Sequence, residues 1–599
     1  MAISLPDAEV RGGHLRNLGP AALCAVSVGL IARSAGGWWP TTWGWAALGL
    51  LLAAAAALLL QPTISLGRLD LALLAGLGSL TVWTGLSWLW SESPPQAILE
   101  LERTTLYLAG VSAFLFVARR RSFASTLGGL LAVDVVLCGH ALATRLVPDL
   151  VGQPSSPFGF RLTGVFLYPN ALGVVAVIGL LLALGFVVDS SNVASRACAA
   201  AATVPLALAL YFSNSRGAWV SLAVGLAAGF GFVARRKHAA AAFAPLAAVA
   251  ALAIWLASRS RPLTLWSDPL AATHDGHRLA FAAFALAVAA ASVAARRTPR
   301  TAVVALVAAL AAIAIAPSSP TRLALAPGSP PPGTTPAGRF FSTTTNSRTE
   351  YWRVAVDDFL RHPIAGSGAG TFVREWYEHR RIRVDVRDAH SLYLETLAEL
   401  GVAGLALLLF VLAIPVVAVW RLRGRPFLAG ALAAYVAFAA HAAVDWDWEL
   451  PAVTFAGLFC GASLVVAARG EGESLALDRR WWSPLLAPVL ALLAFSFVGL
   501  VGNRAVAAAH AAAVKGDWQT AGAEAQQASE WAPWSAEALE LKADAATARN
   551  DLVSSRTLLL RAVRKDPDDF ELWSRLAGVT AGNERRHALD QAARLNPLG

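Results

Sequence analysis

The sequence predicts an all-α, polytopic membrane protein with a large loop between its spans and a helical C-terminal region. The chain has 599 residues, 56% of them hydrophobic, and a mean hydropathy of +0.54. Its apolar residues occur in blocks of about twenty, the length at which an α-helix crosses a bilayer. Lys and Arg cluster at the ends of these blocks.

Hydropathy predicts about 12–15 transmembrane helices. The fifteen candidate segments lie near 18–34, 43–60, 70–90, 104–118, 124–146, 162–188, 196–212, 217–233, 239–257, 278–295, 301–316, 391–420, 426–443, 451–468 and 484–502. The N-terminus lacks a small-residue cleavage site after its first apolar block, so we expect that block to be retained.

Basic clusters orient these spans. They lie at 118–122, 234–238, 295–300, 421–426 and 478–482. A cytoplasmic N-terminus places all of them inside, as the positive-inside bias requires. The net charge of +10 therefore orients the protein in the cytoplasmic (inner) membrane, and we expect no nucleic-acid partner. The same alternation predicts that the loop 317–390 and all residues after 502 are extracytoplasmic.

The composition divides the chain into four parts. Transmembrane helices occupy 1–316 and 391–502, the loop occupies 317–390, and a polar helical region occupies 503–599. The loop begins as a Pro- and Gly-rich linker. It continues with an amphipathic helical stripe formed by Trp352, Ala355, Val356, Phe359 and Leu360.

Short helical patterns repeat after residue 502. Pro533 and Pro567 are 34 residues apart, and Pro597 follows 30 residues later. A 34-residue helix–turn–helix period resembles tetratricopeptide repeats, which predicts a concave face for a protein partner. The alternative is an Ala-rich helical hairpin without a binding face.

Three places in or next to predicted outer segments combine polar side chains with apolar neighbours. They are "RLTGVFLYPNALG" with Arg161 and Asn170, "SNSRGAWVSL" with Arg216, and the loop in which Arg348 leads towards His390 and Tyr393. Arginine binds phosphate oxygens in a bidentate manner and stays charged at any working pH. Histidine can take up a proton near neutral pH.

Each of these residues also has an ordinary structural interpretation. Arg216 could extend its charge to the membrane interface, and Arg348 could pair with Glu350 or Asp357 on a solvated surface. His390 could be an interfacial histidine. "GSGAG" at 366–370 is more typical of a turn than of a phosphate-binding loop, because no strand precedes it. Glu395 and Glu399 could simply mark the wet end of a helix.

The ordered set is more specific than its members. "RLTGVFLYPNALG", "NSRGAW", "SRTEYWRVAVDDFLRHPIAGSGAGTF" and "DAHSLYLETLAELGVAG" follow one another, and "HAAVDWDWELP" comes later. Over roughly residues 20–465 this order resembles the O-antigen ligase and polymerase superfamily. The resemblance implies that His390 is catalytic and that Arg161, Asn170, Arg216, Arg348, Tyr393 and Glu395 bind substrate. This chain has Ser391 where the family often has Asn.

The resemblance further implies a metal-independent, cofactor-free and inverting glycosyltransferase of the C type. Such enzymes take a glycan from a polyprenyl diphosphate, usually undecaprenyl, on the extracytoplasmic face. They pass it to a hydroxyl on a glycan, a lipid or a protein in cell-envelope polysaccharide biosynthesis, including that of lipopolysaccharide. A loop without an Asp-x-Asp motif is compatible with this chemistry.

Other interpretations remain open at this stage. Ligase and polymerase differ in an acceptor that the sequence does not name. A peptidoglycan polymerase has similar topology, but its signature is an outer-loop Asp. A transporter or flippase would be expected to carry charges at the bilayer midplane or internal repeats. A non-catalytic scaffold for envelope assembly is a further alternative.

Overall fold

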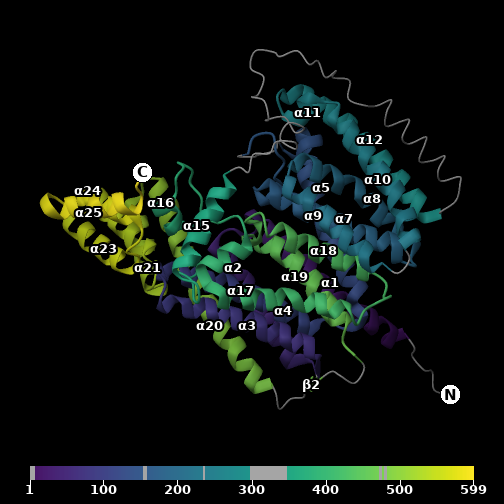
Figure 1. Cartoon of the computed structure of the whole chain (residues 1–599), viewed down its shortest axis with the longest axis horizontal. Helices are drawn as coiled ribbons and strands as arrows, with labels where there is room; N and C mark the ends of the chain where they lie inside the picture. The colour runs from purple at the N-terminus through teal and green to yellow at the C-terminus, as the bar shows by residue number, and fades with distance from the viewer. Residues whose placement is uncertain are drawn as a thin grey trace. The chain divides into compact units, whose positions relative to one another are not determined.

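The computed structural model describes residues 7–61, 63–152, 158–233, 236–296, 347–470, 475–477 and 482–599. Within these ranges the protein is helical apart from two short strands (Figure 1). The chain divides into two compact units. Each unit is discontinuous in sequence. The all-α membrane fold predicted from hydropathy is confirmed.

The first unit contains residues 1–38, 117–344 and 415–472. Its described elements are α1 Asp7–Ala32, η1 Ala35–Gly37, η3 Arg120–Ser122, α5 Phe123–Leu146, α6 Pro148–Val151, η4 Gly164–Phe166, α7 Pro169–Asp189, α8 Val193–Ser213, α9 Arg216–Phe232, α10 Arg236–Ser258, α11 Arg261–Leu265, α12 Pro269–Arg296, α18 Leu428–His441, η5 Asp447–Glu449 and α19 Pro451–Ala467. Helix α7 is almost wholly buried, because it contacts α5, α8, α9, α18 and α19.

The second unit contains residues 39–116, 345–414 and 473–599. Its described elements are α2 Pro40–Leu60, β1 Ile64–Leu66, α3 Arg68–Leu86, η2 Ser87–Leu89, α4 Pro94–Val117, α15 Arg348–Arg361, α16 Phe372–His379, α17 Leu392–Val419, β2 Leu475–Leu477, α20 Trp482–Val514, α21 Trp518–Trp531, α22 Glu537–Ala548, α23 Leu552–Lys565, α24 Phe570–Val579 and α25 Gly582–Leu595. The last five residues of α17 fall within the range of the first unit. Strands β1 and β2 pair antiparallel, with Ser65 opposite Ala476.

Among the described residues, nine helices are long and apolar enough to cross a membrane, and four shorter apolar helices accompany them. Helix α4 is outside both sets because Glu100, Glu102 and Arg103 lie in it. Glu102 is buried and accepts a hydrogen bond of 2.6 Å from the side-chain amide of Asn503 on α20. The span predicted at 301–316 and the linker after it lie outside the described residues.

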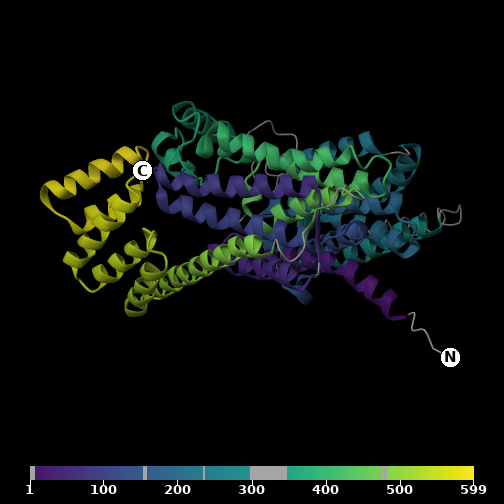
Figure 2. The ribbon, with the colours of Figure 1, turned by 90° about the horizontal axis from the view of Figure 1, so that it is seen from below.

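Three predicted spans differ from the observed helices for identifiable reasons. The span predicted at 162–188 begins only at Pro169, because Gly164–Phe166 form a 3₁₀ turn and Leu167 is left-handed. The span predicted at 391–420 is interrupted at Gly401, where φ is 65°. The span predicted to end at 502 continues to Val514 (Figure 2), because its Ala-rich extension favours helix.

Basic segments predicted to share one side of the membrane contact one another within the first unit. Arg469 donates to the carbonyl of Ala118 at 2.6 Å, and Arg425 donates to the carbonyl of Ala467 at 2.7 Å. Arg425 also donates to the carbonyl of Arg120 at 3.3 Å. Segments 118–122, 421–426 and 467–469 therefore lie on the same side of the bilayer.

The Gly-rich part of the loop packs directly on α17. The amide of Gly368 donates to the carbonyl of Glu399 at 2.9 Å, and the amide of Val402 donates to that of Pro363 at 3.0 Å. A methyl group at Gly366 would lie 2.1 Å from the carbonyl carbon of Glu399, and one at Gly401 would lie 2.2 Å from the carbonyl oxygen of Ile364. Both positions have positive φ, so the segment is a tightly packed turn that only glycine can form.

The C-terminal helices form three consecutive pairs over the described range 482–599. The end of α20 pairs with α21, α22 pairs with α23, and α24 pairs with α25. Pro533, Pro567 and Pro597 each follow the second helix of a pair by two residues, which explains their spacing. The helical pairing is observed, while the closer likeness to tetratricopeptide repeats stays a prediction.

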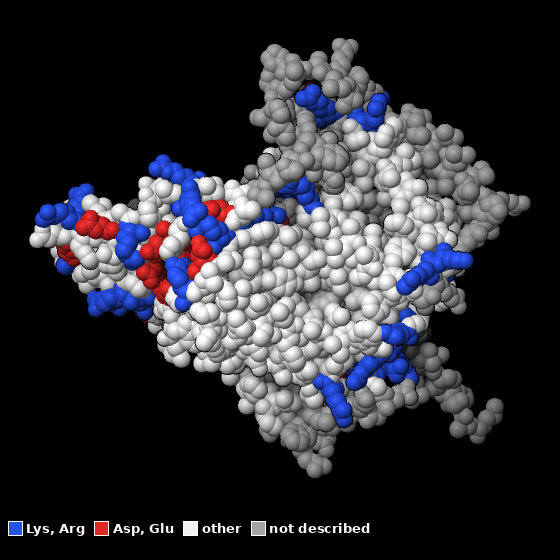
Figure 3. Space-filling view, in the orientation of Figure 1, with Lys and Arg blue, Asp and Glu red and all other residues white. Residues whose placement is uncertain are grey.

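Charge is distributed unevenly within the second unit. In Figure 3 the acidic side chains gather over α15, α16 and the C-terminal helices, whereas the apolar helices show a surface without charge. Charged groups favour water and apolar surface favours lipid, so this unit has one part suited to each.

The packing of the Gly-rich turn leads to a stability prediction. Gly366→Ala should lower the apparent melting temperature of the purified protein far more than Gly516→Ala. Both glycines have φ near +75°, but no described atom lies within 4 Å of a methyl group at Gly516. The control therefore carries only the left-handed backbone cost of about 1–2 kcal/mol. Equal shifts of the two melting temperatures would show that the loop does not pack on α17 in this way.

Candidate functional site

Two groups of the predicted site residues occur in the structure, one in each unit. In the first unit, Arg161 is buried and donates through Nε to the carbonyl of Ser213 at 3.0 Å. Its Nη2 donates to Oδ1 of Asn170. These bonds join the start of α7 to the end of α8, so Arg161 and Asn170 lie together, as their shared motif suggested.

A buried aspartate completes this network. Oδ2 of Asp445 accepts a hydrogen bond from the side-chain amide of Asn170, and Oδ1 accepts one from the Tyr168 hydroxyl, each 2.6 Å long. The backbone amide of Trp446 donates to the same carboxylate at 3.0 Å. Asp445 lies in the late motif quoted above, but no spacing rule connects it to Asn170, and only the fold brings them together.

Arg216 begins α9. Asn214 is left-handed at the end of α8, and Ser215 caps α9 by accepting a hydrogen bond of 3.2 Å from the amide of Ala218. The predicted tight turn between two helices is therefore observed. The helix dipole gives the start of α9 a partial positive charge, and Arg216 adds its own charge at that position.

A second histidine lies beside this turn. His441 ends α18, and its Nδ1 is 3.1 Å from Oδ2 of Asp447; both side chains are buried. A methyl group at Gly217 would lie 3.1 Å from Nε2 of His441, so the pair adjoins the first turn of α9. The predicted site did not include His441 and Asp447, although the motif at 441–451 was the signal that could have found them.

In the second unit, His390 lies at the turn that precedes α17. It has a left-handed backbone with φ of 55°, and its Nδ1 is 3.1 Å from the carbonyl oxygen of Asp388. A carbonyl oxygen only accepts hydrogen bonds, so Nδ1 carries the proton in this contact. In the neutral ring Nε2 is then the basic nitrogen.

Tyr351 connects Arg348 with His390. Its ring centroid is 5.1 Å from that of His390, and Arg348 begins the same helix one turn earlier. Burial raises the pKa of Tyr351, and the positive charge of Arg348 partly offsets this. Glu350 and Asp357, the alternative partners considered for Arg348, both bind Arg353, at 2.7 and 2.6 Å.

The acidic residues of α17 stabilise the loop. Oε2 of Glu395 is 2.7 Å from the amide of Ala389, next to His390. Glu399 accepts hydrogen bonds from the amides of Gly370 and Phe372, at 2.9 and 3.1 Å. Both glutamates are buried, so they do more than mark the wet end of a helix. Tyr393 lies half-buried in the first turn of α17.

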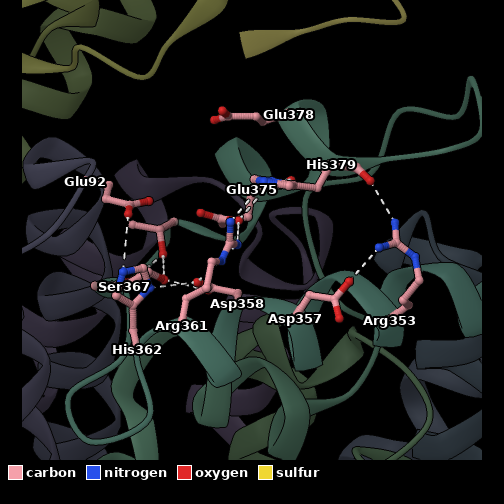
Figure 4. Close-up of polar contacts among 12 residues, drawn as sticks. Glu92, Arg353, Asp357, Asp358, Arg361, His362, Ser367, Glu375, Glu378 and His379 are labelled. Atoms are coloured by element: carbon pink, nitrogen blue, oxygen red, sulfur yellow. Dashed lines mark hydrogen bonds and ion pairs between the residues drawn. The ribbon is translucent and has the colours of Figure 1, made fainter. Parts of the chain in front are cut away.

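Residues of α15 and α16 form a compact cluster of ionisable groups together with Ser367 of the Gly-rich turn (Figure 4). Asp358 accepts a hydrogen bond of 2.7 Å from Ser367 and contacts His362 at 3.1 Å. Glu375 pairs with Arg361 and lies 3.2 Å from Nδ1 of His379. The contacts join α15, the Gly-rich turn and α16, so the cluster holds the loop helices together.

Burial sets the protonation of this cluster. Burial, followed by the charge of Glu375, raises the pKa of Glu92 to about 8 and that of Asp358 to about 6. Burial would also raise the pKa of Glu375, but His379 and Arg361 outweigh it and lower the pKa. The hydrogen bond to Glu375 raises the pKa of His379. At neutral pH Glu375 is therefore ionised, whereas Glu92 keeps its proton.

Comparison with known families adds one finding. The O-antigen ligase family model matches residues 201–409. This range contains Arg216, Arg348, His390, Tyr393 and Glu395, while the network of Arg161, Asn170 and Asp445 lies outside it. A comparison with curated proteins finds no match.

The raised pKa of Glu92 predicts a pH-dependent stability. Folded Glu92 keeps its proton up to about pH 8, whereas an unfolded glutamate releases it near 4.5. The folded state thus binds more protons between these values, so stability falls as pH rises through them. His379 acts in the same direction, because its raised pKa contributes stability that is lost as pH rises through it.

We therefore expect the apparent melting temperature to fall between pH 5 and pH 8.5, and Glu92→Gln to flatten that decline. Glu530→Gln, at an exposed position on α21, is the matched control and should retain the wild-type slope. An unchanged slope in Glu92→Gln would exclude Glu92 as the source.

Proposed function

Because the chain is a membrane protein of the O-antigen ligase family over residues 201–409, we propose that it transfers a glycan from a polyprenyl diphosphate carrier to an acceptor hydroxyl. The family implies glycosyl transfer in cell-envelope polysaccharide synthesis. The observation that carries the residue-level proposal is the geometry of His390, whose Nδ1 faces a carbonyl and whose Nε2 is therefore basic.

In the proposed reaction, the acceptor hydroxyl oxygen attacks C1 of the donor sugar while Nε2 of His390 takes its proton. The new C1–O bond forms as the bond from C1 to the diphosphate breaks. The diphosphate leaves with the electron pair. Attack from the face opposite the leaving group inverts the anomeric centre. Asp388 contributes through its backbone carbonyl, which orients the ring.

We further propose that Arg216 and Arg348 each bind phosphate oxygens of the donor. Both begin a helix, where the helix dipole adds to the positive potential. Such preorganised charge stabilises a leaving diphosphate. The contacts of Arg161 and Asn170 support an indirect role for these two residues. Their hydrogen bonds hold the end of α8, directly before the turn that leads to Arg216. Tyr393 and Glu395 are proposed to face the acceptor.

Contacts within the second unit support a shared face for this chemistry. The amide of Glu92 donates to the carbonyl of Ser367 at 3.2 Å, and Ser93 donates to Asp566 at 2.9 Å. The turn after η2, the loop and the C-terminal helices therefore lie on one side of the membrane. We propose that this side is extracytoplasmic, as the alternation of the predicted spans and the positive-inside bias of the sequence indicate.

His390→Gln should lower turnover of lipid-linked donor by about 10²–10⁴-fold, the usual worth of general-base assistance. Wild-type turnover should rise with pH as the imidazole loses its proton, and this rise should disappear in the variant. His274→Gln, at an exposed position on α12, should behave like the wild type. Full activity in His390→Gln, with folding verified, would remove His390 from the chemistry.

Arg348→Lys and Arg216→Lys should each weaken donor use although the charge is kept, because a lysine cannot make a planar bidentate contact with phosphate. The measurement is donor affinity and turnover in lipid nanodiscs, with Arg33→Lys, at the exposed position that follows α1, as the control. Wild-type kinetics in both site variants would disprove the phosphate assignment. Product length in the same assay distinguishes a ligase from a polymerase.

A further inference from the structure

Helix α16 is joined to the C-terminal helices by its charged side. Nη2 of Arg374 lies 2.7 Å from carboxylate oxygens of both Asp566 and Asp569, and its side chain is only 12% exposed. Nη2 of Arg380 donates to Oδ1 of Asn596 at 3.0 Å. A buried arginine between two carboxylates is a strong and geometrically specific contact.

The C-terminal helices present this contact twice. Asp566 and Asn596 are the C-cap residues that follow α23 and α25, each the second helix of its pair, and each precedes a proline. They are therefore equivalent positions of successive pairs on one edge of the helical stack. The ring of Tyr377 also lies 4.8 Å from that of Phe570, and Arg594 pairs with Glu378 at 3.0 Å.

The opposite side of α16 reaches His390. Trp376 is fully buried, and its ring lies edge-on to Tyr351 with 5.0 Å between centroids. Tyr351 in turn contacts the imidazole of His390. Residues two apart on a helix point in nearly opposite directions. Arg374 therefore contacts the C-terminal helices, whereas Trp376 contacts Tyr351.

We propose that the C-terminal helices position the catalytic histidine of the transferase by binding the chain's own α16 along the edge that contains Asp566 and Asn596. The C-terminal helices bind Arg374, and α16 thereby keeps Trp376 in contact with Tyr351. Tyr351 in turn fixes the orientation of the His390 ring. Arg374 is thus a positioning residue that acts through others. The inference rests on the proposed function of His390.

Loss of this contact should affect the chemical step more than donor binding. A displacement of reacting groups by about 1 Å can cost about 10²-fold in rate. We expect Arg374→Ala to lower kcat by about 10–100-fold while the KM for donor changes by less than about threefold, because α16 supplies none of the proposed phosphate contacts.

The experiment uses the full-length protein in lipid nanodiscs and has two readouts, steady-state kinetics and hydrogen exchange of the amides at 384–391. Arg374→Ala should accelerate that exchange and lower kcat, and Arg374→Lys should restore part of both. Asp569→Asn is a milder variant, because asparagine still caps α24 while one carboxylate charge is lost. Arg383→Ala, at an exposed loop position, is the matched control and should change neither readout.

The inference is overturned if folded Arg374→Ala and Asp569→Asn keep the wild-type kcat, whether or not their exchange accelerates. Accelerated exchange alone would make the contact purely structural. A failure of the proposed function looks different: His390→Gln would then be fully active, while hydrogen exchange would still report whether the C-terminal helices order the segment before α17.

Discussion

Glu399 accepts hydrogen bonds from the amides of Gly370 and Phe372, and much of the second unit depends on this contact. The carboxylate fixes the end of the Gly-rich turn and the first turn of α16 at once. The direction of α16 then determines which way Arg374 and Trp376 point. Because Glu399 is buried, the loss of either partner would leave a charged group without adequate solvation, which is strongly unfavourable.

The first unit also contains buried polar groups that need hydrogen-bond partners among apolar helices. Arg161, Asn170 and Asp445 bring two opposite charges and an amide into a buried region, where each must find partners. Their mutual hydrogen bonds supply them and connect the start of α7 with the end of α8. Arginines of different motifs therefore have different surroundings: Arg161 donates to the carbonyl of Ser213, whereas Arg216 begins α9.

The C-terminal helices bind the loop of their own chain, which is a different role from recruiting a separate partner. Two equivalent positions of successive helix pairs bind Arg374 of α16 and Arg380, which directly follows α16. A helical array that binds its own chain keeps the local concentration of its ligand high, so the contact needs no second molecule.

The sequence by itself determined the membrane class, most span positions, the helical pairs after residue 502 and the local motifs around Arg216 and His390. These features depend on hydropathy, periodicity and turn residues, which act over a few neighbours. Only the tertiary structure decided that Asp445 meets Asn170, that Gly366 packs against Glu399, and that Arg374 binds Asp566. Such contacts join segments that are tens to hundreds of residues apart. No local sequence pattern encodes which buried polar group will form a hydrogen bond with which distant partner.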